Sequence, residues 1–408
     1  MNPMASRSSN NVDMLRAGLR VAGHLAAETI KRPKARKVEE LPRSVGGITT
    51  QWLTAVLCQG HPGAEVVDFG LADGSRGTHE RRRILVMYNA EGVRAGLPTS
   101  VFTKSLPSLV TRMLVGFMGH ARYEMLFYKL IRPSLTIETP LCYYSSSDKT
   151  SLAALHVLED VVHTKGARFL DERTYVDRAM AEGMVDLLAE LHAALYDDPR
   201  LSSELSWLID FPTWIEKGVE RVYTDEFSRK AIAKAQRVVP PGFYARRQEV
   251  WPATMKGLEL HRSQPSTVIH SDVHIGNWYV TSAGRMGLLD WQVLTRGHWS
   301  RDLAYAVSTA LTVADRRRWE RELVTRYVEV FEARGGVVIP VEQAFTWYRQ
   351  QLFHALHMWT QTLCHPRLQP NSQRDEMTYE LLRRITTAID DLGAFDAFDS
   401  PSTPASAS

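Results

Sequence analysis

The sequence predicts an α+β protein that has a β-rich amino-terminal lobe and a mainly helical carboxy-terminal lobe. Short β-type runs dominate the chain up to residue 163, and long patterns with helical spacing dominate it afterwards. Three short β-like pieces, at 267–272, 277–281 and 286–291, interrupt these helices. The expected organisation is therefore a mostly antiparallel sheet with one inserted helix, followed by a helical body.

The composition is that of a globular protein and argues against several functional classes. Of 408 residues, 44% are hydrophobic and 23% are charged, and the net charge of +3 does not require a nucleic-acid partner. The three cysteines, Cys58, Cys142 and Cys364, lie far apart, which favours a reducing cytoplasm over a disulfide framework or a zinc ribbon. No apolar run is long enough for stable membrane insertion, and no signal core opens the chain. The oligomeric state stays open.

The amino-terminal arm, residues 1–44, is expected to be partly disordered and to contain one amphipathic helix. Its first eleven residues are mostly polar. Apolar side chains then recur at helical spacing from Leu15 to Ile30, and a basic linker follows at 32–37. Docking of the arm on the protein's own body is the simpler interpretation, and a membrane-surface role stays open.

The first lobe, residues 45–163, has the signals of a sheet. A short helix is expected over 47–57, with Thr49 or Thr50 near its start. The inserted helix is expected over 121–131, where apolar residues share one stripe. Strand-like runs occupy 64–72, 81–89, 100–106, 141–146 and 151–162.

The second lobe, residues 164–395, is expected to be helical, and the Ser/Pro-rich tail at 396–408 is expected to be disordered. The first helical pattern is the longest amphipathic one before the β-like pieces. The helical patterns occupy 175–198, 207–222, 226–236, 243–262, 300–335, 341–364 and 374–393.

A cluster of His and Asp at 270–274 allows two interpretations. On a strand, His270, Asp272 and His274 share one face, as ligands of a metallohydrolase would. Such enzymes need further ligands, however, and no second His/Asp cluster is present in the sequence. This hypothesis also leaves Asn277 and Asp290 unexplained, so it is kept as a remote alternative.

Phosphoryl transfer explains the same stretch more completely. This reaction needs a carboxylate near the acceptor hydroxyl and magnesium to neutralise the phosphates. Asp272 would supply the carboxylate, while Asn277 and Asp290 would supply the hard oxygens that magnesium prefers. His270 and His274 are then expected to shape the loop and not to act as catalysts.

A phosphotransferase must also bind a nucleotide, and the first lobe has candidates for each part. These are a glycine-containing phosphate loop, a strand lysine with an acidic partner, and a hinge segment that meets the adenine. Individually, such features are common in hairpins and on surfaces. The candidates are Gly74, Ser75 and Gly77 for the loop, Lys104 and Glu124 for the pair, and Leu158, Glu159 and Val161 for the hinge.

The stretch "HSDVHIGNWYV" resembles the catalytic loop of the aminoglycoside phosphotransferase and choline kinase superfamily, which has a bilobal protein-kinase-like fold. The closer resemblance is to the ecdysteroid-kinase-like, or CHK kinase-like, branch. There the metal motif often reads Asp-Phe-Gln, which is similar to Asp290-Trp291-Gln292. The resemblance covers roughly 45–395 and implies an ATP- and magnesium-dependent transfer to a small-molecule hydroxyl.

The resemblance also implies individual roles. Asp272 would be the base, Asn277 and Asp290 would bind magnesium, and Lys104 would contact the phosphates beside Glu124. Asp302, in "RDLA", matches the structural aspartate that braces the catalytic loop. Ser271 departs from the glycine that is commoner at its position, which is a possible change in loop flexibility.

The acceptor pocket is expected in the segment 341–364. Its candidates are Trp347, His354, Met358 and Trp359, although core packing would explain the same aromatic pattern. Over 341–370 the single acidic residue is Glu342, so a polycationic ligand would lack carboxylate partners there. This favours an apolar alcohol, such as a steroid or lipid-like compound. A choline- or aminoglycoside-type kinase and a catalytically inactive nucleotide-binding protein remain alternatives.

Overall fold

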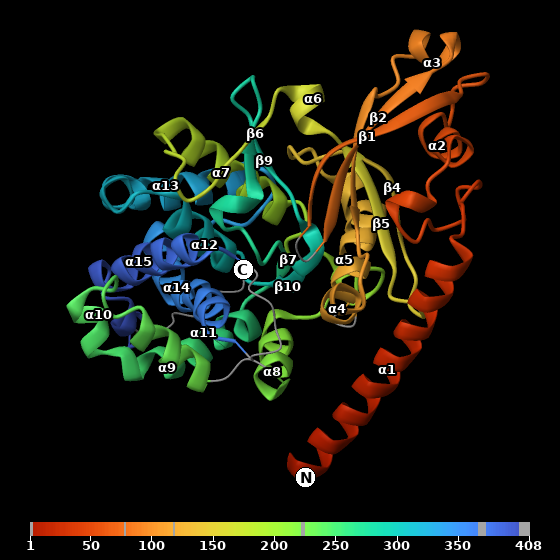
Figure 1. Cartoon of the computed structure of the whole chain (residues 1–408). Helices are drawn as coiled ribbons and strands as arrows, with labels where there is room; N and C mark the ends of the chain where they lie inside the picture. Colours follow the sequence, from red (N-terminus) through yellow and green to blue (C-terminus); the bar gives the residue numbers. More distant parts are fainter. Residues whose placement is uncertain (1–2, 77–78, 117–118, 222–224, 366–372, 400–408) are drawn as a thin grey trace. The chain divides into compact units, whose positions relative to one another are not determined.

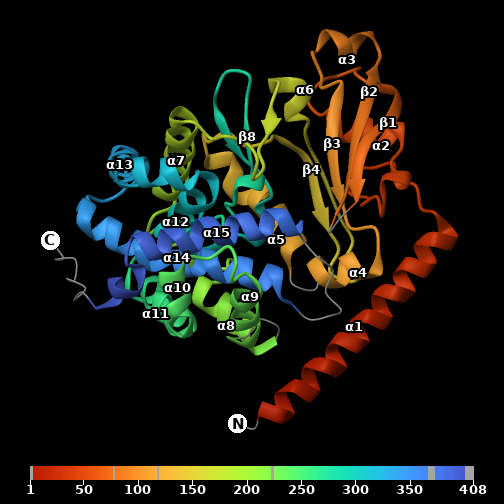
Figure 2. The ribbon, with the colours of Figure 1, turned by 60° about the vertical axis from the view of Figure 1, so that its left-hand side comes forward.

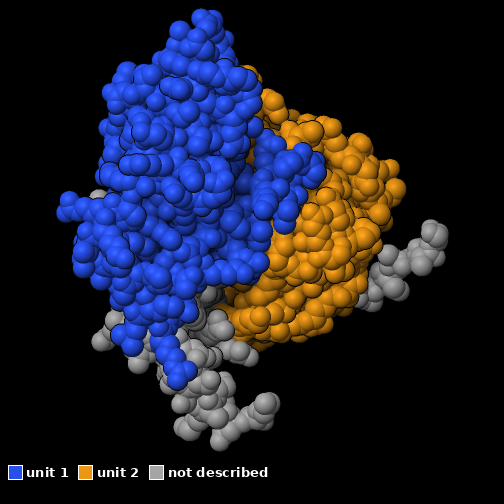
Figure 3. Space-filling view, turned by 90° about the vertical axis from the view of Figure 1, so that its right-hand side faces the viewer, with its two compact units in different colours: residues 1–134, 140–167 blue, residues 135–139, 168–408 orange. Residues whose placement is uncertain are grey.

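The computed structural model divides into two compact units (Figures 1 and 3). It describes residues 3–76, 79–116, 119–221, 225–365 and 373–399. Unit 1 comprises residues 1–134 and 140–167, and unit 2 comprises residues 135–139 and 168–408. Unit 1 contains the antiparallel sheet and unit 2 is mainly helical, so the predicted α+β class is confirmed.

The sheet of unit 1 has five antiparallel strands in the order β1-β2-β3-β5-β4. The inner strand β5, which lies between β3 and β4, is buried along its whole length, which explains its nearly continuous apolar sequence. Helix α2 (Thr50–Leu57) packs Trp52 and Leu53 into the core of this sheet. The strands are β1 (Val66–Arg76), β2 (Glu80–Tyr88), β3 (Ser100–Ser105), β4 (Cys142–Ser147) and β5 (Ala154–Glu159).

The helices of unit 1 differ from the expectation mainly at the amino terminus. Helix α1 begins at Pro3, so residues 3–11, which were expected to be disordered, are helical. Proline suits the first turn of a helix, because the amide hydrogen that it lacks would have no partner there. Helix α2 begins as predicted, with Thr49 accepting a hydrogen bond from the Trp52 amide. The helices are α1 (Pro3–Lys31), α2, α3 (Ala90–Arg94), α4 (Leu109–Thr111), α5 (His120–Leu126) and α6 (Val161–Lys165).

Unit 2 is built around helix α14 (Val341–Leu363), which packs against five other helices (Figure 2). Its residues Leu352, Phe353 and Leu356 are fully buried, which explains why the sequence of α14 has apolar residues on more than one side of the helix. The surrounding helices are α9 (Asp225–Lys234), α11 (Val250–Ser263), α12 (Ser300–Ala310), α13 (Val313–Ala333) and α15 (Asp375–Asp391). The outer helices are α7 (Arg178–Ala193), α8 (Phe211–Arg221) and α10 (Pro241–Ala245).

Three segments of unit 2 differ from the helices and tail expected from the sequence. The pattern at 300–335 is two helices, because the Thr312 side chain caps α13 by accepting from the Asp315 amide. The pattern at 243–262 is likewise divided, into α10 and α11. The predicted tail is ordered at its start, where Phe398 packs on Phe353 with ring centroids 5.8 Å apart, next to Phe395, which packs on the same ring at 5.0 Å. Residues 400–408 lie outside the described residues.

Short strands carry the polar motif of unit 2. Strand β7 (Thr267–Ile269) pairs with β10 (Thr295–Gly297), and β8 (Trp278–Val280) pairs with both β6 (Arg168–Phe169) and β9 (Met286–Leu288). The segment 270–277, called the 270–277 loop below, therefore runs from the end of one small sheet into the next. Of the helices within the described ranges, none combines the length and hydropathy that crossing a bilayer demands.

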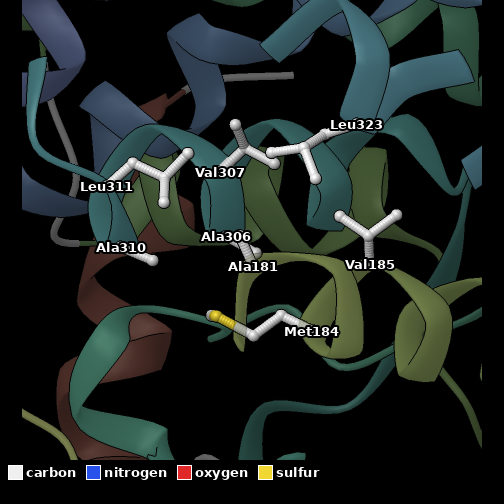
Figure 4. A pocket seen from close by; sticks show the side chains of 8 residues that line it. All are labelled: Ala181, Met184, Val185, Ala306, Val307, Ala310, Leu311 and Leu323. Carbon is white, nitrogen blue, oxygen red and sulfur yellow. The ribbon is translucent and has the colours of Figure 1, made fainter. Parts of the chain in front are cut away.

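A small pocket lies among helices α7, α12 and α13 (Figure 4). All of its lining side chains are apolar, so it offers no group that could orient a polar substrate or hold a charge. It is a gap in the packing of the helical body. The lining residues are Ala181, Met184, Val185, Ala306, Val307, Ala310, Leu311 and Leu323.

Candidate active site

Asp302 braces the start of the 270–277 loop. It lies in the first turn of α12 and is fully buried. Its carboxylate accepts hydrogen bonds from the backbone amides of His270 at 2.6 Å and Ser271 at 3.1 Å. Two consecutive amide groups are thereby fixed by one side chain, so the loop leaves β7 in a single orientation.

The Asp302 carboxylate remains ionised although it has no contact with water. Burial raises its pKa, but the adjacent His192 ring and the charge of Arg301 outweigh burial and hold the pKa at about 2. Arg301 donates to Asp302 at 3.0 Å, and His192 Nε2 lies 3.5 Å from it. The ring of His192 is itself held by the Tyr327 hydroxyl at 2.8 Å. Neither His192 nor Arg301 was predicted from the sequence.

Ser271 has a backbone conformation that normally belongs to glycine. Its φ of +69° lies in the left-handed region, which costs a non-glycine residue about 1 kcal/mol or more. This explains why glycine is commoner at the matching position of the family that the loop resembles. The side chain has a compensating partner, because Ser271 Oγ lies 2.6 Å from Thr295 Oγ1 in a fully buried site.

Both histidines of the loop are engaged in shaping it. His270 donates through Nε2 to the Leu289 carbonyl at 3.0 Å and accepts through Nδ1 from the Asp272 amide at 3.2 Å. Burial lowers the pKa of His270, so the ring is neutral and both of its nitrogens are occupied. His274 accepts from the Gly276 amide at 3.0 Å and caps the turn Ile275–Asn277. The contacts of His270 argue against a metal-ligand role for this ring, and the described residues contain no group of three or more His, Cys, Asp or Glu that could hold a metal.

Asp272 is oriented from two sides and still reaches solvent. Its Oδ2 accepts from Asn277 Nδ2 at 3.2 Å, and its Oδ1 accepts from the Tyr305 hydroxyl at 3.4 Å. The side chain retains 21% of its exposure. A carboxylate held in this way can meet an incoming hydroxyl group without first reorganising.

Tyr305 is a site residue that the sequence analysis missed. Burial and the nearby charge of Asp272 raise the pKa of Tyr305 well above its usual range, so the phenol stays protonated and serves as a donor. It lies three residues after Asp302 on α12, so both side chains project from neighbouring positions of one helix. That spacing was the available signal, and it becomes informative only once the helix is known to pass beside the loop.

Replacing Tyr305 with phenylalanine should remove the donor to Asp272 while keeping the ring. The carboxylate of Asp272 would then lose one of the two side-chain hydrogen bonds that orient it. At neutral pH we expect kcat to fall several-fold, in keeping with about 1 kcal/mol for one hydrogen bond, with little change in the nucleotide KM.

The matched control is Tyr348→Phe, because Tyr348 is also fully buried and its hydroxyl has no hydrogen-bond partner among the described residues. It should leave kcat unchanged. A wild-type kcat for Tyr305→Phe as well would show that Tyr305 does not act on Asp272.

The oxygens expected to bind magnesium lie on adjacent segments. Asn277 donates through Nδ2 to both the backbone and the side chain of Asp272, at 2.7 and 3.2 Å, which directs its Oδ1 away from that residue. The Leu289 amide donates to the Asn277 carbonyl at 3.1 Å, so Asp290, the next residue, is joined to the same loop. Asp290 is mostly buried and has a φ of +70°. Amide and carboxylate oxygens are hard donors, so this set fits magnesium.

Unit 1 contains the other polar pair that the sequence predicted. Lys104 on β3 donates to Glu124 on α5 at 2.7 Å, and both side chains are almost fully buried. His156, which the sequence analysis did not single out, is the cross-strand neighbour of Lys104 and lies 3.8 Å from Glu124. A buried ion pair is costly unless its geometry is good and further polar groups support it.

The predicted phosphate loop is part of the hairpin of β1 and β2. Gly74 pairs with Arg82, and a Cβ atom on Gly74 would approach the Arg81 carbonyl to 2.4 Å, so the close strand contact requires glycine. Ser75 is exposed and pairs with Arg81. Gly77 lies outside the described residues.

The predicted hinge residues lie at the junction of β5 and α6, and the Glu159 side chain contacts other residues of unit 1. Leu158 and Glu159 end β5, and Val161 begins α6. The Glu159 carboxylate accepts from the Leu141 amide and from Lys165, both at 3.0 Å. Any contact of this segment with a nucleotide would therefore be made by the backbone more readily than by this carboxylate.

The four candidates for the acceptor pocket differ in position. Trp359 packs edge-on against His274, with ring centroids 5.5 Å apart, so the structure brings it to the 270–277 loop. His354 is buried and bonded to Gln351 and the Thr254 carbonyl. Trp347 packs on His298, and Met358 packs on the apolar cluster around Phe211 and Leu258.

Comparison with known proteins gives one sequence family. Residues 143–348, half of the chain, match the phosphotransferase enzyme family. Among solved structures, a spectinomycin phosphotransferase in complex with ADP and spectinomycin is similar with 11% identity and a TM-score of 0.46, covering 85% of this chain and 97% of that one. An ethanolamine kinase from Plasmodium vivax is similar with 10% identity and a TM-score of 0.46, covering 80% and 83%. No curated protein matches the chain.

Proposed function

Because the chain belongs to the phosphotransferase enzyme family, we propose that it transfers the γ-phosphate of ATP to a hydroxyl group of a small molecule, with Asp272 as the base. The observation that carries this proposal is the way in which Asp272 is held. Asn277 and Tyr305 orient the carboxylate, and Asp302 anchors the loop that presents it. Phosphoryl transfer depends mainly on such positioning.

The remaining roles follow from the donor groups. Asp272 would orient the acceptor hydroxyl and accept its proton. Magnesium, when held by Asn277 and Asp290, would neutralise charge on the phosphate oxygens. Lys104 would contact the phosphates, and Glu124 would keep the ammonium group in place, as their 2.7 Å contact supports. Each role is a prediction about this chain's own side chains.

We assign the acceptor to largely apolar alcohols, such as steroid or lipid-like compounds, in keeping with the ecdysteroid-kinase-like branch. Trp359 retains only 2% of its exposure, and its ring beside His274 makes the immediate surroundings of the loop apolar. Burial of apolar ligand surface is worth about 25 cal/mol per Å² before association costs. A desolvated polycation would instead need carboxylates, which α14 lacks apart from Glu342.

A screen for phosphate gain tests this proposal. Purified protein with Mg-ATP is incubated with pooled sterols, terpenoid alcohols, choline-type amines, sugars and aminoglycosides, and products are detected by mass spectrometry. We expect apolar alcohols to gain one phosphate group. Efficient turnover of choline or an aminoglycoside alone would contradict the acceptor class and leave the reaction standing. Failure of every pool, together with no Mg-ATP binding by calorimetry, would favour a catalytically inactive protein.

A further inference from the structure

Residues 16–37 carry an unusual excess of positive charge. This stretch covers the carboxyl-terminal half of α1 and the linker after it, and it contains seven Lys or Arg residues and one acidic residue, Glu28. The protein as a whole has a net charge of only +3. The phosphotransferase reaction makes no use of this concentration of positive charge.

The single acidic residue of this stretch faces the body of unit 1. Glu28 accepts from Arg112 at 2.7 and 3.1 Å, and Arg112 is almost fully buried. Ala17 and Val21 are buried as well and lie on the same side of α1 as Glu28. From residue 16 onwards, α1 is thus docked on unit 1 through one face, and its opposite face is exposed.

The outward face of α1 combines apolar and basic side chains. Leu19 and Ile30 are 67% and 82% exposed. Arg16, Arg20 and Lys31 are exposed as well and lie along one edge of this apolar face, since Lys31 directly follows Ile30 and neighbouring residues of a helix are about 100° apart. Single exposed apolar residues are ordinary, but here two of them share a face that three cations flank on one side.

The linker after α1 adds more positive charge, and part of this charge lies beside the docked face of the helix. Arg32 has a φ of +43°, which ends α1, and Pro33 follows. Arg32 and Lys34 also line a hollow of unit 1 together with Arg43, Arg112 and Glu28, so basic groups outnumber acidic ones there too. Arg36 and Lys37 are exposed.

We propose that the outward face of α1 from Arg16 to Lys31, together with the linker 32–37, docks the protein on a membrane surface that contains anionic phospholipids. An amphipathic basic helix lies in the interface with its apolar side chains among the acyl chains and its cations at the headgroups. Each basic residue near such a surface strengthens binding about fivefold. The exposed leucine and isoleucine favour a bilayer over a nucleic acid, which would not require them. The proposal is independent of the phosphotransferase reaction.

Vesicle flotation with the full chain tests this surface. Binding to vesicles of 70% phosphatidylcholine and 30% phosphatidylserine should exceed binding to pure phosphatidylcholine about tenfold or more and should weaken from 50 to 300 mM NaCl, as expected for charge-driven docking. The variant Lys31→Glu/Arg36→Glu/Lys37→Glu should lose this preference. The matched control Arg229→Glu/Lys230→Glu/Arg318→Glu changes the net charge equally at exposed positions of unit 2 and should keep it.

A second pair of variants separates a membrane from a nucleic acid. Leu19→Ser/Ile30→Ser keeps every charge and should weaken vesicle binding several-fold, with the melting temperature unchanged because both side chains are exposed. Equal binding of the wild-type protein to the two vesicle types would overturn the proposal. It would also be overturned if the triple variant in unit 2 lost the preference for anionic vesicles to the same extent as the triple variant in unit 1. Binding to RNA that exceeds binding to vesicles and is unaffected by Leu19→Ser/Ile30→Ser would assign the surface to nucleic acid instead.

Discussion

Replacing Asp272 with asparagine is expected to lower kcat for phosphoryl transfer by about 10²- to 10⁴-fold, the range that general base catalysis contributes. An amide cannot accept the proton of the acceptor hydroxyl at neutral pH. The fold should tolerate the change, because the backbone carbonyl of residue 272 would still accept from Asn277 Nδ2, as it does now at 2.7 Å. Turnover is measured with an alcohol that the wild-type protein accepts.

The affinity for Mg-ATP separates a lost base from a damaged protein. Calorimetry should give a similar dissociation constant for Asp272→Asn and the wild-type protein, since Asp272 is assigned to the acceptor and not to the nucleotide. The matched control is Asp396→Asn, where an exposed carboxylate pairs with Arg246. If Asp272→Asn kept wild-type turnover, the assignment of the base would be wrong.

Replacing Asp302 with asparagine is expected to lower the free energy of unfolding by about 3–5 kcal/mol, the usual cost of removing one partner from a buried ion pair. Arg301 would retain its charge in a fully buried position. The introduced amide nitrogen would also face the backbone N–H group of His270 or Ser271, which now donate to the carboxylate. Thermal or urea unfolding measures the loss.

The pH dependence gives this prediction a sign. The pKa of Asp302 in the folded protein, about 2, lies below the value of the unfolded chain, so its stabilising contribution is complete above the unfolded pKa and is lost as pH falls towards 2. The difference in the free energy of unfolding between the wild-type protein and Asp302→Asn should therefore become smaller below about pH 4. Asp396→Asn should lose at most about 1 kcal/mol, as is typical of an exposed pair. Equal stability of both variants would contradict a structural role for Asp302.

The short motif of the candidate site could be recognised in the sequence, whereas most of the side-chain contacts of the site could not be predicted from it. The contact between Asp272 and Asn277 could be predicted from the sequence, because five residues of one tight loop cannot separate them far. The capping role of Thr49 at the start of α2 could be predicted as well, because it follows from a local rule. Lys104 and Glu124 were a longer-range hypothesis, and the structure brings them together across twenty residues. How these residues act on a nucleotide stays a prediction.

The sequence by itself determined the α+β class, the order of sheet and helices, and the residue types of the 270–277 loop. Those features are encoded by local periodicity and by the chemical requirements of a short motif. Only the tertiary structure decided which distant side chains support the loop. Tyr305, His192 and Arg301 approach the loop from other elements. An aromatic stripe such as that of α14 has the same sequence pattern whether it faces a core or a ligand. Trp359 and His354 are both buried, but Trp359 contacts His274 and His354 contacts Thr254, because the helices packed around α14, and not its own pattern, determine what each face touches.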